Sequence, residues 1–331
     1  MGKTVRIQNR VAESSLTLPA CVALVVLAWC LPLLGCDTEA PNLKLGRWEF
    51  ALSQVWTENL LGLFVCLCTA YIIAETNNSM QIIRIRTRLM SCVWLLFVAC
   101  LPFAHTIGPP TLCALCYALG LFLLYRCDRE EVPVVQVFHS MLCLGVGSLF
   151  WMPLAWLGIL YFCCLGAVVR HFSWRCFWAG LIGLLLPYWC WFLWGLGTNN
   201  YLPLIGHLRQ LSDFQIPALS LLLKWPATWW ACWILSALLS VVGILHFYLT
   251  SFNDRLRVRT LFHLYFAQSI FFQMALFLQP SCYPVLMPLF LIATTPFVAH
   301  FFALTHSRLS NLLFYMGCIG CIALLIVQMK G

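Results

Sequence analysis

Apolar residues fill most of this chain in long runs, and short polar segments separate one run from the next. A helix crosses the hydrocarbon core of a bilayer with about 20 consecutive apolar residues. The runs that we interpret as membrane segments are 16–35, 55–74, 89–105, 111–125, 134–150, 153–169, 176–196, 227–249, 260–278, 284–303 and 309–328. Because backbone polar groups inside a bilayer must be satisfied within the chain, these runs predict helices. The predicted fold is therefore all-α, a polytopic transmembrane bundle of about 11 helices.

The composition agrees with this fold class. The chain is 62% hydrophobic and 9% charged, whereas soluble domains are about 45–50% apolar and about 25% charged. No stretch between the apolar runs is long enough for a soluble domain, so residues 1–331 form a single integral membrane domain. The two longest connections cover about 36–54 and 197–226.

The basic residues predict the orientation of the bundle. If the N-terminus is inside, fourteen of the 19 Lys and Arg residues fall in the inner segments. The inner set is Lys3, Arg6, Arg10, Arg84, Arg86, Arg88, Arg126, Arg129, Arg170, Arg175, Arg255, Arg257, Arg259 and Arg308, and the outer set is Lys44, Arg47, Arg209, Lys224 and Lys330. Positively charged loops stay in the cytoplasm. The N-terminus is therefore expected inside, and an odd helix count puts the C-terminus outside.

The formal net charge of +8 is then mainly an orientation signal, beside which a role in binding anionic lipid stays open, and nucleic-acid binding is not indicated. The 19 cysteines lie mostly within the apolar runs. Two pairs, Cys113/Cys116 and Cys318/Cys321, have CxxC spacing. No second Cys or His pair accompanies either one, so we interpret them as small packing residues and predict no metal site.

Ionisable residues inside a membrane are costly and usually functional. This chain has few of them. His139 lies within an apolar run, while His246, His263 and His300 lie in or near predicted helix ends. No Asp or Glu falls clearly at the middle of a predicted segment, and this absence disfavours a proton- or sodium-coupled carrier without excluding it.

The residues that could carry chemistry lie on the predicted outer side. Asp37 and Glu39 directly follow the first segment, and the second outer connection contains His207, Arg209 and Asp213. Carboxylates can act as a base or hold a divalent cation, and Arg suits a phosphate because its guanidinium is bidentate. If the two connections fold over one another, an enzyme that transfers sugars from a lipid phosphate would find its groups there. Ordinary solvated loop charge is the alternative.

The middle of the chain resembles an uncharacterised family of Bacteroidota inner-membrane proteins, known as a domain of unknown function. The features that carry this resemblance are the basic loop 84–88, the hairpin around Pro102 to Pro110, the 148–153 turn, the 170–175 segment and Pro187-Tyr188. The resemblance implies a multi-pass protein of the bacterial inner (cytoplasmic) membrane and brings no activity with it.

The predicted topology also resembles the polyprenol-dependent glycosyltransferases of the GT-C type. They share a cytoplasmic N-terminus, acids just after the first helix and a long outer connection after the seventh. This resemblance implies that Asp37 or Glu39 is the catalytic acid and that Arg209 binds the phosphate of a polyprenol-phosphate carrier. His207 and Asp213 would complete the substrate site.

Three functions stay open on the sequence. The first is a GT-C-like enzyme that acts on a polyprenol-phosphate-linked sugar at the outer leaflet. The second is a transporter or flippase, and the third is a non-catalytic membrane subunit of an envelope complex. Membrane lipids are expected partners in all three, and the sequence indicates no particular cofactor. Convergence of the outer residues would favour the enzyme, and polar groups in the membrane interior would favour transport.

Overall fold

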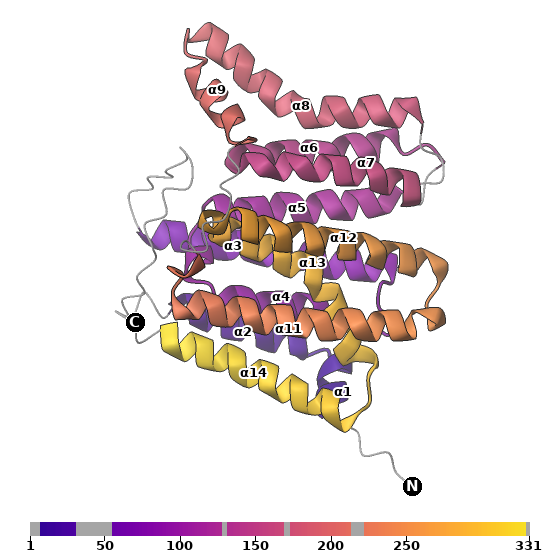
Figure 1. Ribbon diagram of the computed structural model, residues 1–331. Helices are drawn as coiled ribbons and strands as arrows, with labels where there is room; N and C mark the ends of the chain where they lie inside the picture. The colour runs from indigo at the N-terminus through magenta and orange to yellow at the C-terminus, as the bar shows by residue number, and fades with distance from the viewer. Residues whose placement is uncertain (1–6, 31–54, 128–130, 169–172, 213–221, 329–331) are drawn as a thin grey trace.

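The computed structural model of the protein describes residues 7–30, 55–127, 131–168, 173–212 and 222–328, and within these ranges every regular element is a helix. The α-helices are α1 (Ile7–Glu13), α2 (Thr17–Cys30), α3 (Val55–Met80), α4 (Leu89–Ala99), α5 (Pro109–Arg126), α6 (Val134–Phe150), α7 (Leu157–Val168), α8 (Trp174–Gly197), α9 (Leu202–Arg209), α11 (Ala227–Thr250), α12 (Leu256–Leu278), α13 (Tyr283–Leu304) and α14 (Arg308–Gln328). Most of them pack side by side along one direction (Figure 1).

Within the described residues, each of the eleven predicted apolar segments overlaps a helix of the structure. Seven helical stretches are long and apolar enough to cross a membrane. These are Trp56–Met80, Pro109–Arg126, Trp174–Gly197, Ala227–Asn253, Leu256–Leu278, Pro280–Leu304 and Arg308–Val327. Four shorter apolar stretches accompany them, namely Thr17–Cys30, Leu89–Ala99, Val134–Phe150 and Met152–Gly166. The prediction of an all-helical bundle with membrane-spanning character is confirmed at this level.

Several helix ends differ from the sequence boundaries for identifiable reasons. Three short 3-10 turns contain a proline in their first two residues. One begins at Pro102, one contains Pro153 and one begins at Pro280. Proline fits the first turn of a helix because its φ is fixed and its missing N–H would have no partner there. These prolines therefore end one helix and start the next, and α4 stops at Ala99 rather than near residue 105.

On the predicted inner side, two helices are longer than expected. Helix α3 continues to Met80, and α12 begins at Leu256, so Arg257 and Arg259 lie on a helix rather than in a loop. The Asn77 side chain stabilises the end of α3. Its Nδ2 donates to Thr87 O at 2.9 Å and its Oδ1 accepts from the backbone N–H of Ile83 at 3.1 Å.

Helix α13 is the central helix of the bundle, and all of its candidate membrane span is buried inside the protein. It tolerates Pro288 and Pro296 within its length because neighbouring helices surround it. The indole N–H of Trp94 on α4 donates to Pro288 O at 3.4 Å. Helix α11 approaches closely at Gly243, where a Cβ atom would lie 2.7 Å from Phe297 O.

The short helix α1 docks at the carboxyl end of α13. The Gln8 side chain is buried there, and its Nε2 donates to Phe302 O at 2.6 Å and to Thr305 O at 3.1 Å. Ser310 of α14 donates to Gln8 Oε1 at 3.0 Å. The last carbonyls of a helix have no partner within it, so Gln8 satisfies them and joins α1, α13 and α14.

The described basic residues separate between the two ends of the bundle. Figure 1 shows α1 and the turns α3–α4, α11–α12 and α13–α14 at one end, on the right, and α9 at the other. We call the first the arginine end, which carries Arg10, Arg84, Arg86, Arg88, Arg126, Arg175, Arg255, Arg257, Arg259 and Arg308. Arg209 and Lys224 lie at the opposite end. Lys3, Arg6, Lys44, Arg47, Arg129, Arg170 and Lys330 lie outside the described residues.

Candidate functional site

The sequence-predicted outer site can be followed for two of its five residues. His207 and Arg209 lie on α9, which α8 carries at the end of the bundle opposite to the arginine end (Figure 1). Asp37, Glu39 and Asp213 lie outside the described residues. The convergence of acids with Arg209 therefore stays a prediction.

His207 attaches α9 to the neighbouring helices. Its Nε2 lies 2.9 Å from Ser148 O, near the end of α6, and its ring centroid lies 5.3 Å from that of Trp191 on α8. Burial lowers the pKa of His207, and the hydrogen bond to Ser148 O opposes part of that shift. The imidazole of His207 therefore has a structural role, since it gives the Ser148 carbonyl a hydrogen-bond partner and holds α9 against α6.

Arg209 is different, because its residue is exposed at the end of α9. An exposed guanidinium can meet a phosphate without losing an internal partner. Of the two described outer residues, Arg209 is therefore the one that remains accessible to a ligand.

The described residues also contain an ionisable site that the sequence analysis did not single out. Its centre is Asp254, in the turn between α11 and α12, whose side chain is only 1% exposed. The backbone holds this turn, since Asp254 N donates to Ser251 O at 2.9 Å and Arg259 Nε donates to Asp254 O at 3.1 Å. A carboxylate buried this far needs compensating partners.

Two partners reach the Asp254 carboxylate from distant parts of the chain. Arg84, in the loop after α3, places Nε 2.5 Å from Oδ1. His300, on the central helix α13, places Nε2 3.4 Å from Oδ2. The carboxylate therefore connects a loop and a turn to the central helix. The partly exposed guanidinium of Arg84 lies toward the surface, and the fully buried imidazole of His300 lies toward the core.

His300 is fully buried among aromatic rings. Its ring centroid lies 5.2 Å from Phe262, 5.5 Å from Phe247 and 5.6 Å from His246. Within the part of the chain that the structure describes, neither ring nitrogen of His300 has a hydrogen-bond partner, and Asp254 Oδ2 has none either. His246 continues the series, because its Nε2 lies 3.1 Å from Thr305 Oγ1. We call Arg84, Asp254, His300 and His246 the Asp254 cluster.

The bundle interior holds a second group of polar side chains, on α5, α7 and α12. The Tyr117 hydroxyl donates to Gln268 Oε1 at 2.8 Å, and both residues are fully buried. Gln268 Nε2 and the hydroxyl of Tyr161 have no partner among the described residues. Nearby, a cavity of about 10 Å³, enough for about one water molecule, is lined by Thr76 and Tyr265 among others. Unsatisfied polar groups of this kind in a membrane helix bundle mark candidate hydration sites.

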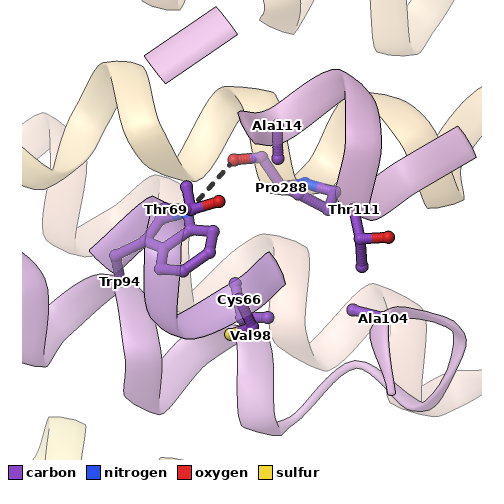
Figure 2. A pocket seen from close by; sticks show the side chains of 8 residues that line it. All are labelled: Cys66, Thr69, Trp94, Val98, Ala104, Thr111, Ala114 and Pro288. Carbon is purple, nitrogen blue, oxygen red and sulfur yellow. Dashed lines mark hydrogen bonds between the residues drawn. The ribbon is translucent and has the colours of Figure 1, made fainter. Parts of the chain in front are cut away.

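A further small cavity lies between α3, α4, α5 and α13. Its lining is Cys66, Thr69, Trp94, Val98, Ala104, Thr111, Ala114 and Pro288, and its volume is about 10 Å³ (Figure 2). The two hydroxyls on this lining already donate to backbone carbonyls, at 2.9 Å from Thr69 to Val65 O and 3.0 Å from Thr111 to Gly108 O. The cavity therefore offers little to a polar ligand.

The chain matches no protein-family model, no curated protein and no solved structure. Its own residues must carry the functional argument. No group of three or more His, Cys, Asp or Glu side chains within the described ranges is arranged to hold a metal ion. Cys113 of the first CxxC pair is fully buried, with its Sγ 3.4 Å from Gly147 O, and no two of the described cysteines form a disulfide.

The Asp254 cluster escaped sequence analysis because its members are far apart in the chain. In the sequence, Asp254 is one charge among several in a basic loop, and His246 and His300 lie in or near predicted helix ends. One signal was present: Asp254 is a single acid next to Arg255, Arg257 and Arg259. An isolated carboxylate in a basic segment is an indication that it neutralises a specific partner.

Proposed function

We propose that the protein is a multi-pass membrane carrier whose transport cycle uses the Asp254 cluster as its proton-binding site. The observation that carries this proposal is the buried carboxylate of Asp254, held between Arg84 and the fully buried His300. A buried ionisable side chain is a functional candidate, because burying its charge is costly unless partners compensate it. The polar groups around Gln268 support the proposal, since they could form part of a hydrated route through the interior.

The proposed chemistry is a proton transfer with a mechanical consequence. Loss of the negative charge on Asp254 would remove its attraction for the Arg84 guanidinium. The contact joins the α3–α4 loop, the α11–α12 turn and α13. Its loss would let the loop and turn move relative to the central helix. Return of that charge would form the ion pair again.

The orientation belongs to the same proposal. We infer eleven membrane crossings, an N-terminus in the cytoplasm and a location in the bacterial inner membrane. The separation of basic residues between the two ends of the bundle supports this orientation by the positive-inside rule. The Asp254 cluster would then face the cytoplasm, and α9 with Arg209 would lie on the outer side.

The test combines infrared titration with transport currents in reconstituted membranes. A protonated buried carboxyl group gives a carbonyl stretching band, which should appear in the wild type on acidification and be missing in Asp254→Asn. Currents evoked by pH jumps with pooled small metabolites on a supported membrane should be lost in Asp254→Asn and in His300→Gln. His263→Gln is the matched control, because His263 is an exposed histidine near the start of α12, the end of that helix that adjoins Asp254. Wild-type currents in both cluster variants, or an unchanged carboxyl band in Asp254→Asn, would refute the carrier.

The second candidate is the GT-C-like enzyme at the outer leaflet, and the exposure of Arg209 favours it. On this proposal Asp37 or Glu39 acts on the acceptor while Arg209 binds the phosphate of a polyprenol carrier. Asp37→Asn or Glu39→Gln should abolish an envelope-glycan phenotype at unchanged protein level. Arg209→Lys should impair it, because Lys loses the bidentate contact. Full function in all three variants would leave the carrier and the non-catalytic subunit as the remaining hypotheses.

A further inference from the structure

A carboxamide lies in the bundle interior with only one of its two ends paired. The Gln268 side chain is fully buried on α12, and its Oε1 accepts a hydrogen bond of 2.8 Å from the hydroxyl of Tyr117 on α5. Its Nε2 carries two N–H donors, and it has no partner within the part of the chain that the structure describes. Rotation of the amide would exchange the two ends. One end of Gln268 therefore lacks a described partner in either arrangement.

A second unpaired polar group lies against the neighbouring turn of α5. The Tyr161 side chain is fully buried on α7, and its hydroxyl has no partner among the described residues. A Cβ atom at Gly120 would lie 3.6 Å from this hydroxyl, and Gly120 follows Tyr117 by one turn of α5. The glycine therefore leaves space beside a hydroxyl group that can both donate and accept a hydrogen bond.

A small cavity adjoins the same stretch of α5 and α12. Its lining includes Tyr265, one turn before Gln268 on α12, and Ala118 and Leu121, which follow Tyr117 on α5. Its volume is about 10 Å³, enough for about one water molecule. Cavities that stay dry are lined by apolar groups, whereas buried waters pair with polar groups that have no other partner. The available volume thus restricts a ligand to the size of water.

The surrounding helices carry no charge that would suit an ion. Residues 109–125, 157–168 and 260–278 contain no Asp, Glu, Lys or Arg, and the histidine among them, His263, is exposed. An ion buried without a counter-charge is very costly. The ligand must therefore be neutral, accept a hydrogen bond from the amide of Gln268 and pair with the hydroxyl of Tyr161. Water meets all three requirements.

We propose that the interior between α5, α7 and α12 is a binding site for water, with the Gln268 amide and the Tyr161 hydroxyl as its principal partners. A buried water typically makes about three hydrogen bonds. The two N–H groups of Gln268 and the hydroxyl of Tyr161 provide that number between them. The site does not depend on the carrier function.

The position of the site on α12 relates it to the carrier of the preceding proposal. Phe262, Tyr265 and Gln268 follow one another at intervals of three residues and so share a face of the helix. The ring of Phe262 lies 5.2 Å from that of His300 in the Asp254 cluster. On the carrier proposal, the bound water would therefore hydrate the interior two turns beyond the contact with His300.

The experiment is hydroxyl-radical footprinting of the full chain in lipid nanodiscs, with mass spectrometry as the readout. X-ray radiolysis of water produces radicals that react with the side chains next to each water molecule. Because Tyr161 and Tyr117 are fully buried, bulk solvent does not reach them. Tyr283 is the matched control residue, since it is equally buried and its hydroxyl donates to Trp229 O at 3.0 Å. Tyr161 and Tyr117 should be labelled several-fold faster than Tyr283.

Variants connect this labelling with the unpaired groups. Gln268→Leu removes the amide and should lower the labelling of Tyr161 several-fold, to the rate of Tyr283. Ser269→Ala is the matched control on the next residue of α12, because the Ser269 hydroxyl already donates to Phe266 O at 2.8 Å, and it should keep the wild-type labelling. Tyr161→Phe removes the other partner and should lower the labelling of Tyr117.

The proposal is overturned if wild-type Tyr161 and Tyr117 are labelled no faster than Tyr283, if Gln268→Leu keeps the wild-type labelling, or if Ser269→Ala loses as much. Faster labelling of Tyr283 reports an opened bundle. Should Gln268→Leu show it, Tyr161→Phe decides, and unchanged labelling of Tyr117 there overturns the proposal. Asp254→Asn separates this site from the carrier: wild-type currents in that variant refute the carrier, whereas its labelling of Tyr161 should equal that of the wild type.

Discussion

At the scale of single residues, the burial of Asp254 is the most consequential feature of the structure. The carboxylate has exchanged water for the Arg84 guanidinium at Oδ1, while His300 Nε2 lies 3.4 Å from Oδ2 without a hydrogen bond. A buried ion pair contributes little net stability compared with a well-packed apolar pair, but removal of one partner leaves an uncompensated charge. Such a site is retained for specificity or function, and its energetics can be measured directly.

The first prediction concerns the Arg84–Asp254 pair. Arg84→Gln should destabilise the protein by about 3 kcal/mol, the lower end for a broken buried pair, because the Arg84 side chain is itself partly exposed. Arg84→Gln/Asp254→Asn should recover most of that loss, since it removes both charges. Unfolding by denaturant in detergent micelles measures both values. Equal destabilisation in the single and double variants would show that the two charges are not coupled.

The second prediction concerns the pH dependence of α9. Burial lowers the pKa of His207 below its ordinary value, so the folded state favours the neutral imidazole. The stability that comes from burying the neutral His207 ring is therefore fully present above the ordinary histidine pKa of about 6.5. It is lost as pH falls through the lowered pKa. Hydrogen exchange of α9, corrected for its intrinsic pH dependence, should show less protection at low pH. His207→Gln should remove this dependence, and a dependence that persists in it would assign the effect elsewhere.

At the scale of elements, the bundle depends on a few close approaches between helix backbones. Membrane helices gain little from the hydrophobic effect among themselves, so small residues that permit close packing matter more. Gly243 of α11 faces the backbone of α13 at Phe297, and Gly183 of α8 faces Phe138 O of α6. These glycines hold neighbouring helices against one another, and the approach at Gly243 helps to enclose α13.

The third prediction tests the α11–α13 approach. A Cβ atom at residue 243 would lie 2.7 Å from Phe297 O, so Gly243→Ala must separate the helices and should cost about 1–3 kcal/mol. Gly317→Ala on α14 is the matched control, because its Cβ would meet Leu239 at an ordinary 3.6 Å. The control should be neutral or slightly stabilising, since Ala favours a helix. Thermal unfolding in lipid nanodiscs separates the two, and equal midpoints would contradict the packing argument.

At the scale of the whole molecule, the two ends of the bundle differ in charge and in structure. The arginine end contains the Asp254 cluster and is joined to α1 through Gln8. The other end carries α9, with His207 anchored and Arg209 exposed. The proposed proton exchange and the proposed chemistry on lipid-linked sugars therefore belong to opposite ends of the bundle.

The fourth prediction is the topology itself. A reporter fused after Gly331 should report a periplasmic location, and one inserted in the α11–α12 turn at Asn253 should report a cytoplasmic one. Eleven crossings and the positive-inside rule require opposite sides for these two positions. A cytoplasmic signal from both fusions would mean an even number of crossings after Asn253, and in that case one of the helices α12, α13 and α14 would not span the membrane.

The sequence by itself determined where the helices lie and which turns share an end of the bundle. Both follow from local patterns, because apolar run length and loop charge act on each segment separately. Tertiary structure alone decided that Asp254 is buried, since Arg84 and His300 lie 170 and 46 positions away from it in the chain. No local pattern encodes which turn meets which helix. That choice depends on the close approach at Gly243, on the docking of Gln8 and on the enclosure of α13, and these contacts exist only once the helices have packed.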